Sequence, residues 1–291
     1  MKCVTNALLP QLSVLPGTYV FCFCFLVPRY LVLLNIKLIV LADCHHRAID
    51  TNMRNILVSC NLILFLAWHA SAGYHPDRVH FVDNVTGASL FRGAAPVLNN
   101  TFVIDALRTD VQRVAKSEAG IAVPDDFHLI IVTMLSTVKP SEKTELSVEE
   151  AYAAANSNVS LVHWPIVGDV ISPDTYPSSL CKSHAKDYDS SGDHMPSKVQ
   201  QLRGLLTNTT ASSSYRVVYF HCDAGMDRTG ELYGDYQMTF GNQSYSTVLD
   251  FDNAIENPPR DINHVNQRAL EWYCLYLLEA KGINRNCVHK C

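Results

Sequence analysis

The residues best placed to do chemistry are a cysteine and an arginine six positions apart, within Tyr215 to Gly230 (YRVVYFHCDAGMDRTG). A β-branched and aromatic run ends at His221-Cys222, and a helical pattern follows Arg228-Thr229. A cysteine between a strand and a helix N-terminus lies where backbone N–H groups converge on an anion, and the same field favours a thiolate. The thiolate can attack phosphorus while Arg228 directs two donors at the phosphoryl oxygens.

This HCx5RT pattern resembles the phosphate loop of the cysteine-dependent phosphatases, the protein-tyrosine and dual-specificity superfamily. The segment 91–96 (FRGAAP) also resembles the F/Y-R-G/S-x-x-P start of dual-specificity phosphatases, and the similarity extends over about residues 91–278. It implies an α/β fold with a central, mostly parallel sheet of four to five strands flanked by helices. The loop is then expected at the carboxyl end of a strand, where open α/β sheets bind ligands. No cofactor and no metal is implied.

The resemblance assigns a role to each residue of the loop. Cys222 is the expected nucleophile, Arg228 binds the phosphoryl group, Thr229 donates its hydroxyl to the thiolate, and His221 orders the loop. Backbone amides are expected to line a phosphate cradle, and they belong to Asp223, Ala224, Gly225, Met226, Asp227 and Arg228.

Two aspartates compete for the role of general acid, which must protonate the leaving oxygen. Asp169 follows Trp164-Pro165, as such an acid does in many relatives, although two to four residues later than usual. Asp227 lies inside the loop, and its D-R-T context resembles the myotubularin-type lipid phosphatases and certain bacterial phosphatases. Asp174, further along the loop after Trp164, is a third candidate behind these two.

A phosphorylated protein, carrying phosphotyrosine or phosphoserine/threonine, is the first substrate expected. Inositol-lipid phosphatases often carry lysine inside this loop, and this loop has none, although D-R-T favours that class. A small phosphoester, an inositol phosphate or a phosphoinositide remains the alternative, as does a non-catalytic phosphate-binding module. A thiol redox protein is disfavoured because no C-x-x-C occurs at Cys222. The net charge of −5 argues against nucleic-acid binding, and the histidines lack paired metal-ligand spacing.

The first 72 residues differ in composition from the rest of the chain. Residues 18–27 and 31–42 are apolar, and Met53-Arg54-Asn55 precedes an apolar run that ends in Ala70-Ser71-Ala72. The second pattern is that of a secretory signal peptide. We expect residues 1–52 to be a gene-model extension, 53–72 a signal peptide, and 73–291 the phosphatase domain. The alternative is a membrane anchor within residues 17–72.

Cysteine usage and glycosylation sequons agree with secretion. Beyond Gly73, N-x-S/T sequons begin at Asn84, Asn99, Asn158, Asn208 and Asn242. Setting Cys222 aside leaves four cysteines, enough for two disulfides with three possible connectivities: Cys181, Cys274, Cys287 and Cys291.

Strands alternate with helical patterns along the rest of the chain, as in an α/β sheet with helical crossovers. Strands are expected at 78–82, 89–92, 128–135, 159–167 and 215–221. Helices are expected at 102–119, from Ser147 with a capping box to Glu150, and at 195–206, 229–240 and 263–281.

Overall fold

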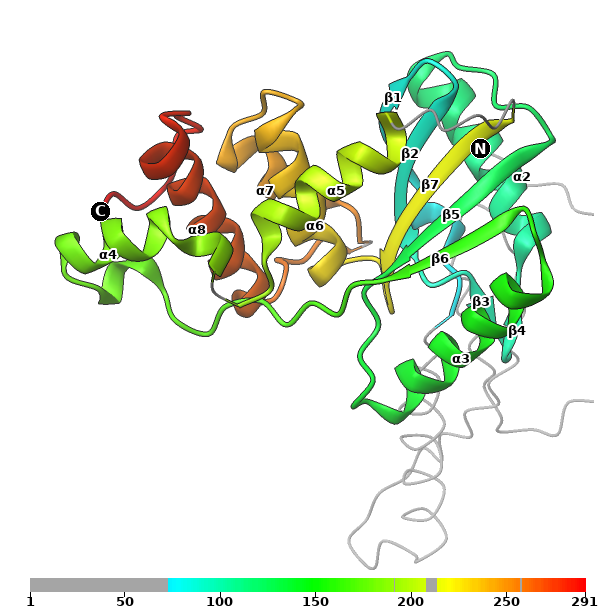
Figure 1. The fold of residues 1–291 in the computed structure, drawn as a ribbon, viewed down its shortest axis with the longest axis horizontal. Helices are drawn as coiled ribbons and strands as arrows, with labels where there is room; N and C mark the ends of the chain where they lie inside the picture. Colours follow the sequence, from blue (N-terminus) through cyan, green and yellow to red (C-terminus); the bar gives the residue numbers. More distant parts are fainter. Residues whose placement is uncertain (1–72, 191, 208–213, 257) are drawn as a thin grey trace, which may run out of the picture. The chain divides into compact units, whose positions relative to one another are not determined.

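Segments rich in β-branched and aromatic residues, which pack well on a pleated surface, form the central sheet. The computed structural model describes residues 73–291 apart from 191, 208–213 and 257, and its five-stranded sheet has the order β1-β2-β7-β5-β6 (Figure 1). The strands are β1 (His80–Val85), β2 (Ala88–Ala94), β5 (Phe127–Thr133), β6 (Val159–His163) and β7 (Tyr215–Cys222). β1 is antiparallel to β2, and all other neighbours are parallel. The expected mostly parallel sheet is confirmed.

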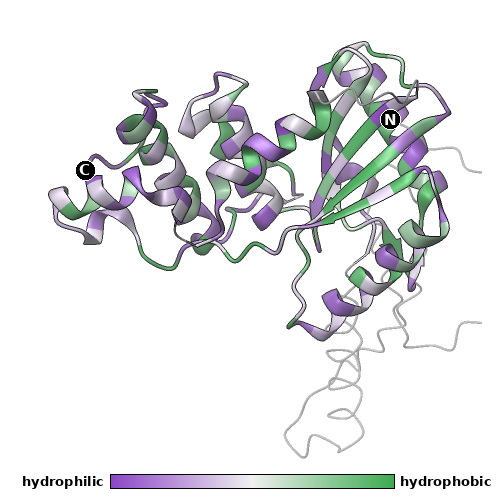
Figure 2. Cartoon of the chain, in the orientation of Figure 1, coloured by the Kyte–Doolittle hydropathy of each residue, from purple (hydrophilic) through white to green (hydrophobic). Residues whose placement is uncertain are grey.

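Helices cover both faces of this sheet. The helices are α2 (Ile104–Ala119), α3 (Pro140–Ala155), α4 (Ser178–Lys186), α5 (Met195–Thr207), α6 (Asp227–Thr239), α7 (Tyr245–Ala254) and α8 (His264–Lys281). Short 3₁₀ turns are η1 (Pro76–Arg78), η2 (Pro173–Thr175) and η3 (Tyr188–Ser190), and a small hairpin joins β3 (Val97–Leu98) to β4 (Thr101–Phe102). Hydrophobic residues concentrate on the central strands, while the helices alternate in polarity (Figure 2).

The alternation of side chains along β7 divides the interior into two cores. Val218 and Phe220 pack in the core formed with helices α4 to α8, whereas Val217 and Tyr219 pack in the core formed with α2. Because successive side chains point to opposite faces, Cys222 joins the first core.

Two of the expected boundaries differ from the structure by four residues or more. The strand from Val159 ends at His163 rather than at Val167, because Pro165 has no N–H to continue the ladder. The helix expected from Ser147 begins at Pro140, where proline suits the first helical turn. Ser147 lies inside that helix, and its hydroxyl donates to the Lys143 carbonyl at 2.9 Å.

The predictions for residues 1–72, including the signal peptide and the membrane anchor, lie outside the described residues. None of the helices in the described part combines the length and the hydropathy needed to cross a bilayer.

Candidate active site

The phosphate loop lies between the end of β7 at Cys222 and the start of α6 at Asp227. Cys222 is only 3% exposed, and it is the free cysteine of the described residues. The sequence produces this geometry because the apolar run of β7 continues to the thiol and Gly225 then reverses the chain with φ of 73°.

The loop carbonyls are turned toward donors outside the loop. The contacts are Ala95 N–H to Asp223 O at 3.0 Å, Arg78 Nη1 to Ala224 O at 2.7 Å, and Arg92 Nη2 to Gly225 O at 3.3 Å. Among the described residues, no acceptor is found for the backbone N–H groups of residues 223–228. These N–H groups and the α6 N-terminus therefore provide the donors that an anion requires.

Gly225 is necessary for the close approach of the loop to β2. A Cβ at this position would lie 2.5 Å from both the Ala94 backbone nitrogen and the Gly93 carbonyl carbon. Backbone atoms cannot move aside as a flexible side chain can, and the positive φ disfavours any L side chain. Only glycine fits this turn.

Arg228 is held by a carboxylate that the sequence did not reveal. Its Nη1 and Nη2 donate to the two oxygens of Glu142 at 2.7 and 2.9 Å, and Nη1 also donates to the Met134 carbonyl at 2.8 Å. Burial favours the neutral form of Glu142, but hydrogen bonds from Arg228 and the Ser136 N–H, and the charge on Arg228, outweigh it and lower its pKa to about 2. The pair fixes the guanidinium in a bidentate geometry.

Thr229 and His221 both contact the backbone of Cys222. The Cys222 N–H donates to Thr229 Oγ1 at 2.8 Å, and His221 Nδ1 lies 3.1 Å from the Cys222 carbonyl oxygen. On its other side, His221 Nε2 is 3.1 Å from Glu149 Oε1, with both side chains fully buried. This last contact has an ion-pair distance but not hydrogen-bond geometry. Both residues lie where they can fix the position of Cys222.

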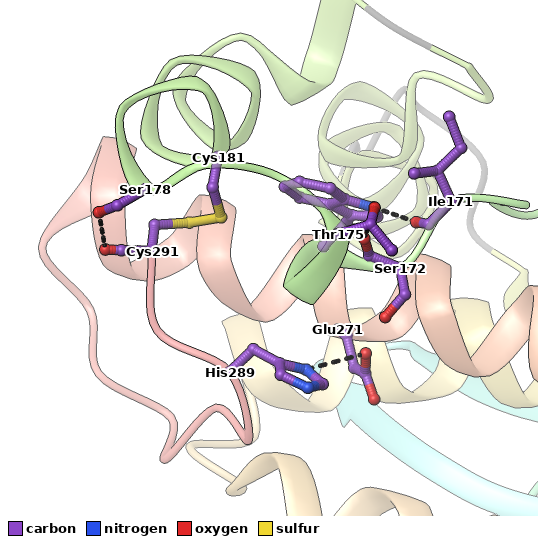
Figure 3. Close-up of a disulfide and its surroundings, with 9 residues drawn as sticks. Ile171, Ser172, Thr175, Ser178, Cys181, Glu271, His289 and Cys291 are labelled. Carbon is purple, nitrogen blue, oxygen red and sulfur yellow. Dashed lines mark hydrogen bonds and ion pairs between the residues drawn. A yellow bond between two sulfur atoms is a disulfide. The ribbon is translucent and has the colours of Figure 1, made fainter.

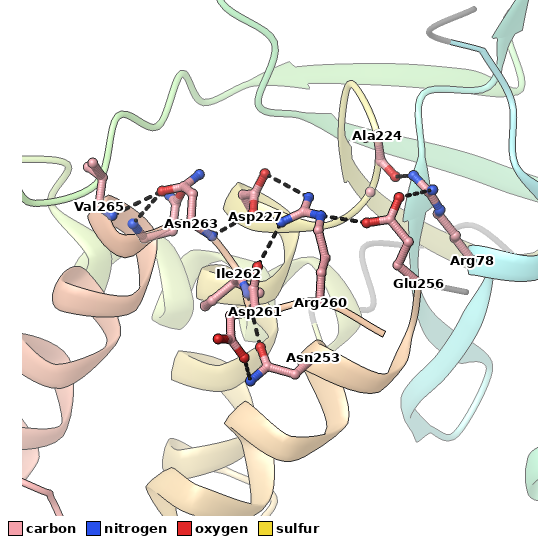
Figure 4. A network of polar contacts seen from close by, with 12 residues as sticks. Arg78, Ala224, Asp227, Asn253, Glu256, Arg260, Asp261, Ile262, Asn263 and Val265 are labelled. Atoms are coloured by element: carbon pink, nitrogen blue, oxygen red, sulfur yellow. Dashed lines mark hydrogen bonds and ion pairs between the residues drawn. The ribbon is translucent and has the colours of Figure 1, made fainter. Parts of the chain in front are cut away.

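Asp227 forms a bidentate ion pair at the start of α6 (Figure 4). Arg260 donates to its two oxygens at 3.0 and 3.2 Å, and the Asn263 N–H donates to Oδ1 at 2.8 Å. Burial raises the pKa of Asp227, yet the hydrogen bonds from Arg260 and Asn263 and the charge on Arg260 bring it below its usual value. An ionised carboxylate held in this way lacks the proton that a general acid donates.

Asp169 lies on the loop after β6 and is half-buried. Its Oδ1 accepts the Ile171 N–H at 2.9 Å, and its own N–H donates to the Val265 carbonyl at 3.1 Å. Within the described residues no ion pair involves its carboxylate. Asp174 is exposed instead, 4.0 Å from His289 of the C-terminal segment.

Sequence reasoning missed the charged residues that surround the loop. Asp223 accepts a hydrogen bond from Lys139 Nζ at 2.7 Å, and Arg78 bridges Ala224 and Glu256 (Figure 4). The paired residues are far apart in the chain, by 84 positions for Lys139 and Asp223, 146 for Arg78 and Ala224, and 178 for Arg78 and Glu256. No local spacing rule could have identified them. The structure also holds no group of metal-ligating side chains among the described residues.

The structure selects one of the three possible disulfide connectivities. Cys181 pairs with Cys291, and Cys274 pairs with Cys287. The first bond joins α4 to the C-terminal segment, where Ser178 Oγ also donates to the Cys291 carbonyl at 2.6 Å (Figure 3). Cys222 is left unpaired.

No protein-family model matches the chain, and no curated protein matches it. The chain is similar to several solved structures, among them two phosphatases. The core catalytic domain of the PP-IP phosphatase SIW14 from S. cerevisiae is 16% identical, with a TM-score of 0.33 over 66% of this chain and 84% of that chain. Kinase associated phosphatase with its catalytic cysteine replaced by serine is 12% identical, with a TM-score of 0.39 over 72% and 96%. DUSP15 is 15% identical, with a TM-score of 0.30 over 73% and 96%.

Proposed function

We propose that this protein hydrolyses phosphoesters through a phosphocysteine intermediate. The observation that carries the proposal is the placement of Cys222. The free, buried thiol ends β7 under a loop whose N–H groups have no acceptor among the described residues, beside an arginine locked by Glu142. Fixed donors of this kind stabilise the charge that develops on the phosphoryl oxygens.

In the first step the Cys222 thiolate attacks phosphorus. The S–P bond forms as the ester P–O bond breaks, and the leaving oxygen takes a proton from an acid. The guanidinium of Arg228 and the loop N–H groups bind the three equatorial oxygens. In the second step water attacks the phosphocysteine, the deprotonated acid accepts a proton from that water, and inorganic phosphate and the thiolate are released.

Asp169 is the better candidate for this acid. Asp227 is ionised and engaged by Arg260 and Asn263, so it serves to fix the start of α6. Asp169 has no such cationic partner among the described residues. It follows β6, which is parallel to β5 and β7, so the loop after β6 leaves the same edge of the sheet as the phosphate loop after β7. Parallel strands bring their carboxyl ends together.

A phosphorylated protein is the substrate we propose first. A polyphosphorylated small molecule is the second candidate. The loop sequence has no lysine, but cationic side chains outside the loop supply positive charge near it. The Lys139 side chain is 54% exposed beside Asp223, and the Arg260 side chain is 40% exposed beside Asp227. Both already pair with loop aspartates, which reduces their attraction for a further phosphate.

We also infer passage through the secretory pathway. The two disulfides require an oxidising compartment, and the sequon asparagines in the described residues, Asn84, Asn99, Asn158 and Asn242, are all exposed. Expression in a secreting eukaryotic cell should give protein whose mass falls on treatment with an N-glycosidase and whose N-terminus is Gly73. Unglycosylated protein retained in the cytosol would contradict this.

Hydrolysis of aryl phosphates tests the main proposal. We expect turnover that Cys222→Ser abolishes, and a loss of roughly 10²- to 10⁴-fold in Asp169→Asn on esters with poor leaving groups. Asp227→Asn should lose less activity than Asp169→Asn on the same esters. Folded wild-type protein without turnover, whose Cys222→Ser variant binds phosphopeptides or inositol phosphates, would instead indicate a phosphate-binding module.

A further inference from the structure

A line of polar side chains joins the first turns of α6 and α8. We call this set the α6–α8 seam, and it consists of Asp227, Glu231, Asn263 and Asn266. The Asn263 N–H donates to Asp227 Oδ1 at 2.8 Å, and Asn266 Nδ2 donates to Glu231 Oε2 at 2.6 Å. The two asparagines are joined by Asn263 Nδ2 to Asn266 Oδ1 at 2.6 Å. The seam therefore links the helix that ends the phosphate loop to the helix beside it.

The same turn of α8 supports the loop that carries Asp169. The Val265 carbonyl accepts the Asp169 N–H at 3.1 Å. A Cβ on Gly168, where φ is +88°, would lie 3.0 Å from Val265 Cγ1 and 3.1 Å from Asn266 Nδ2. The loop backbone thus lies directly against a seam residue.

Other side chains of α8 and the chain before α5 hold the remainder of this loop. Arg268 donates to the Val170 carbonyl at 2.6 Å. Trp272 Nε1 donates at 2.8 Å to the carbonyl of Ile171, which is labelled in Figure 3. In the chain before α5, Asp193 Oδ2 accepts the N–H groups of Val167 and Gly168 at 2.7 Å each. The loop backbone is therefore held both by α8 and by Asp193.

Glu231 is fully buried at the centre of the seam, and its Oε1 lacks a partner among the described residues. Burial raises its pKa to about 8, with the Asn266 hydrogen bond and Lys198 opposing, and Asp193 and Asp169 adding to the increase. Asp235, one turn further along α6, is buried as well, and its charge too would oppose ionisation. At neutral pH Glu231 acts as a neutral acceptor for the Asn266 amide. A fully buried polar side chain such as Glu231 does not contribute to apolar packing, so its hydrogen bond with Asn266 calls for an explanation.

We propose that the α6–α8 seam positions the Asp169 loop over the phosphate cradle, with Glu231 and Asn266 as positioning residues. The inference rests on the proposed function with Asp169 as the general acid. Asp227 then belongs to the support of the acid rather than being the acid. The seam ties the loop that holds the phosphoryl group to the loop that protonates the leaving group.

The test is the dependence of rate on the leaving group. A general acid matters for phenyl phosphate, whose leaving group is basic, and much less for dinitrophenyl phosphate. Asn266→Ala should lower kcat on phenyl phosphate by about 10- to 100-fold, and on dinitrophenyl phosphate by less than about threefold, with KM unchanged on both. Thr239→Val is the matched control, because it removes a 2.8 Å contact with Tyr273 between the last residue of α6 and the middle of α8. It should leave both rates unchanged.

Two further variants keep the proposal falsifiable should Asn266→Ala not fold. Gly168→Ala moves the loop without altering either helix and should show the same selective loss on phenyl phosphate. Glu231→Gln preserves a neutral acceptor for Asn266 and should retain activity, whereas Glu231→Leu should not. The Cys222→Ser variant first establishes the reaction. The positioning role would then be overturned if Asn266→Ala lost activity equally on both esters, or if Gly168→Ala kept full activity on phenyl phosphate.

Discussion

In the proposed mechanism, the pair of Arg228 and Glu142 determines how well the cradle is prepared for a phosphoryl group. Arginine can bind a planar, doubly charged face only when its side chain is already oriented, and here Glu142 orients it through two hydrogen bonds. The Glu142 side chain is 4% exposed, so solvent does not screen the pair.

Glu142→Gln should lower kcat/KM for an aryl phosphate by roughly 10- to 100-fold, because a misplaced guanidinium loses transition-state contacts. Inhibition by inorganic phosphate should weaken in parallel. Glu150→Gln, on the exposed face of the same helix, is the control and should match the wild type. Normal phosphate inhibition in Glu142→Gln would contradict the role of the pair.

Gly225 allows a second prediction at this scale. Gly225→Ala should abolish hydrolysis and lower the free energy of unfolding by roughly 2 kcal/mol or more, because it combines a positive φ with a backbone clash. Gly120→Ala isolates the first effect, since Gly120 has φ of +69° and open space around its Cβ position. Urea unfolding of both variants should show the larger loss for Gly225→Ala.

The spacing in the sequence was sufficient to place Cys222, Arg228 and Thr229 together, because all three belong to one local turn. The partners of that turn could not be predicted in the same way. Glu142 and Lys139 reach the loop from 86 and 84 residues away. Their contacts depend on how β5 and β7 pair in the sheet, which no short-range pattern specifies.

At the scale of elements, α3 presents an acidic face to the phosphate loop. Glu142, Glu145 and Glu149 follow helical spacing and are all buried, and two of them contact Arg228 and His221. Glu145 is 7% exposed. Burial, and then the charges of Asp223, Glu149 and Glu142, raise its pKa to about 7, with His221 opposing.

Glu145 should therefore make stability depend on pH. In the unfolded chain it ionises near 4.5, whereas the fold keeps it protonated up to about 7. The folded state binds more protons in this window, so the free energy of unfolding falls as pH rises from 4.5 to 7. As pH rises through that range, the free energy of unfolding of Glu145→Gln should increase relative to wild type by on the order of 2 kcal/mol. Thermal unfolding between pH 4.5 and 8 measures this, and parallel curves for the two proteins would contradict it.

The elements that sequence could predict are those with strong periodicity or long apolar runs. β5, β7, α2 and α8 were expected close to their observed bounds. The Ser147 start was wrong because a serine can also bond back to a helix carbonyl. α4 and α7 were missed because each is short, and their packing against α8 and α6 rather than their periodicity stabilises them.

At the scale of the whole molecule, the helical core beside the sheet is closed by the C-terminal segment. Its two disulfides fasten α4 and α8 to residues that follow α8. Figure 3 shows the first of them, Cys181–Cys291. The sequence supplied the four cysteines but not their pairing, since that depends on α4 packing beside α8. Trp272 of α8 donates a hydrogen bond to the loop after β6. The disulfides that hold α8 in place therefore also help to position Asp169 on that loop.

The two disulfides should contribute unequally to stability. A crosslink restricts the unfolded chain more when it closes a longer loop, and the sequence separations are 110 residues for Cys181–Cys291 and 13 for Cys274–Cys287. Replacing both cysteines of the first pair by alanine should lower the free energy of unfolding by about 5 kcal/mol, against about 3 kcal/mol for the second pair. Denaturant unfolding of the two double variants measures the difference. A larger loss from the shorter loop would show that the bond within the C-terminal segment, rather than its tie to α4, maintains the helical core.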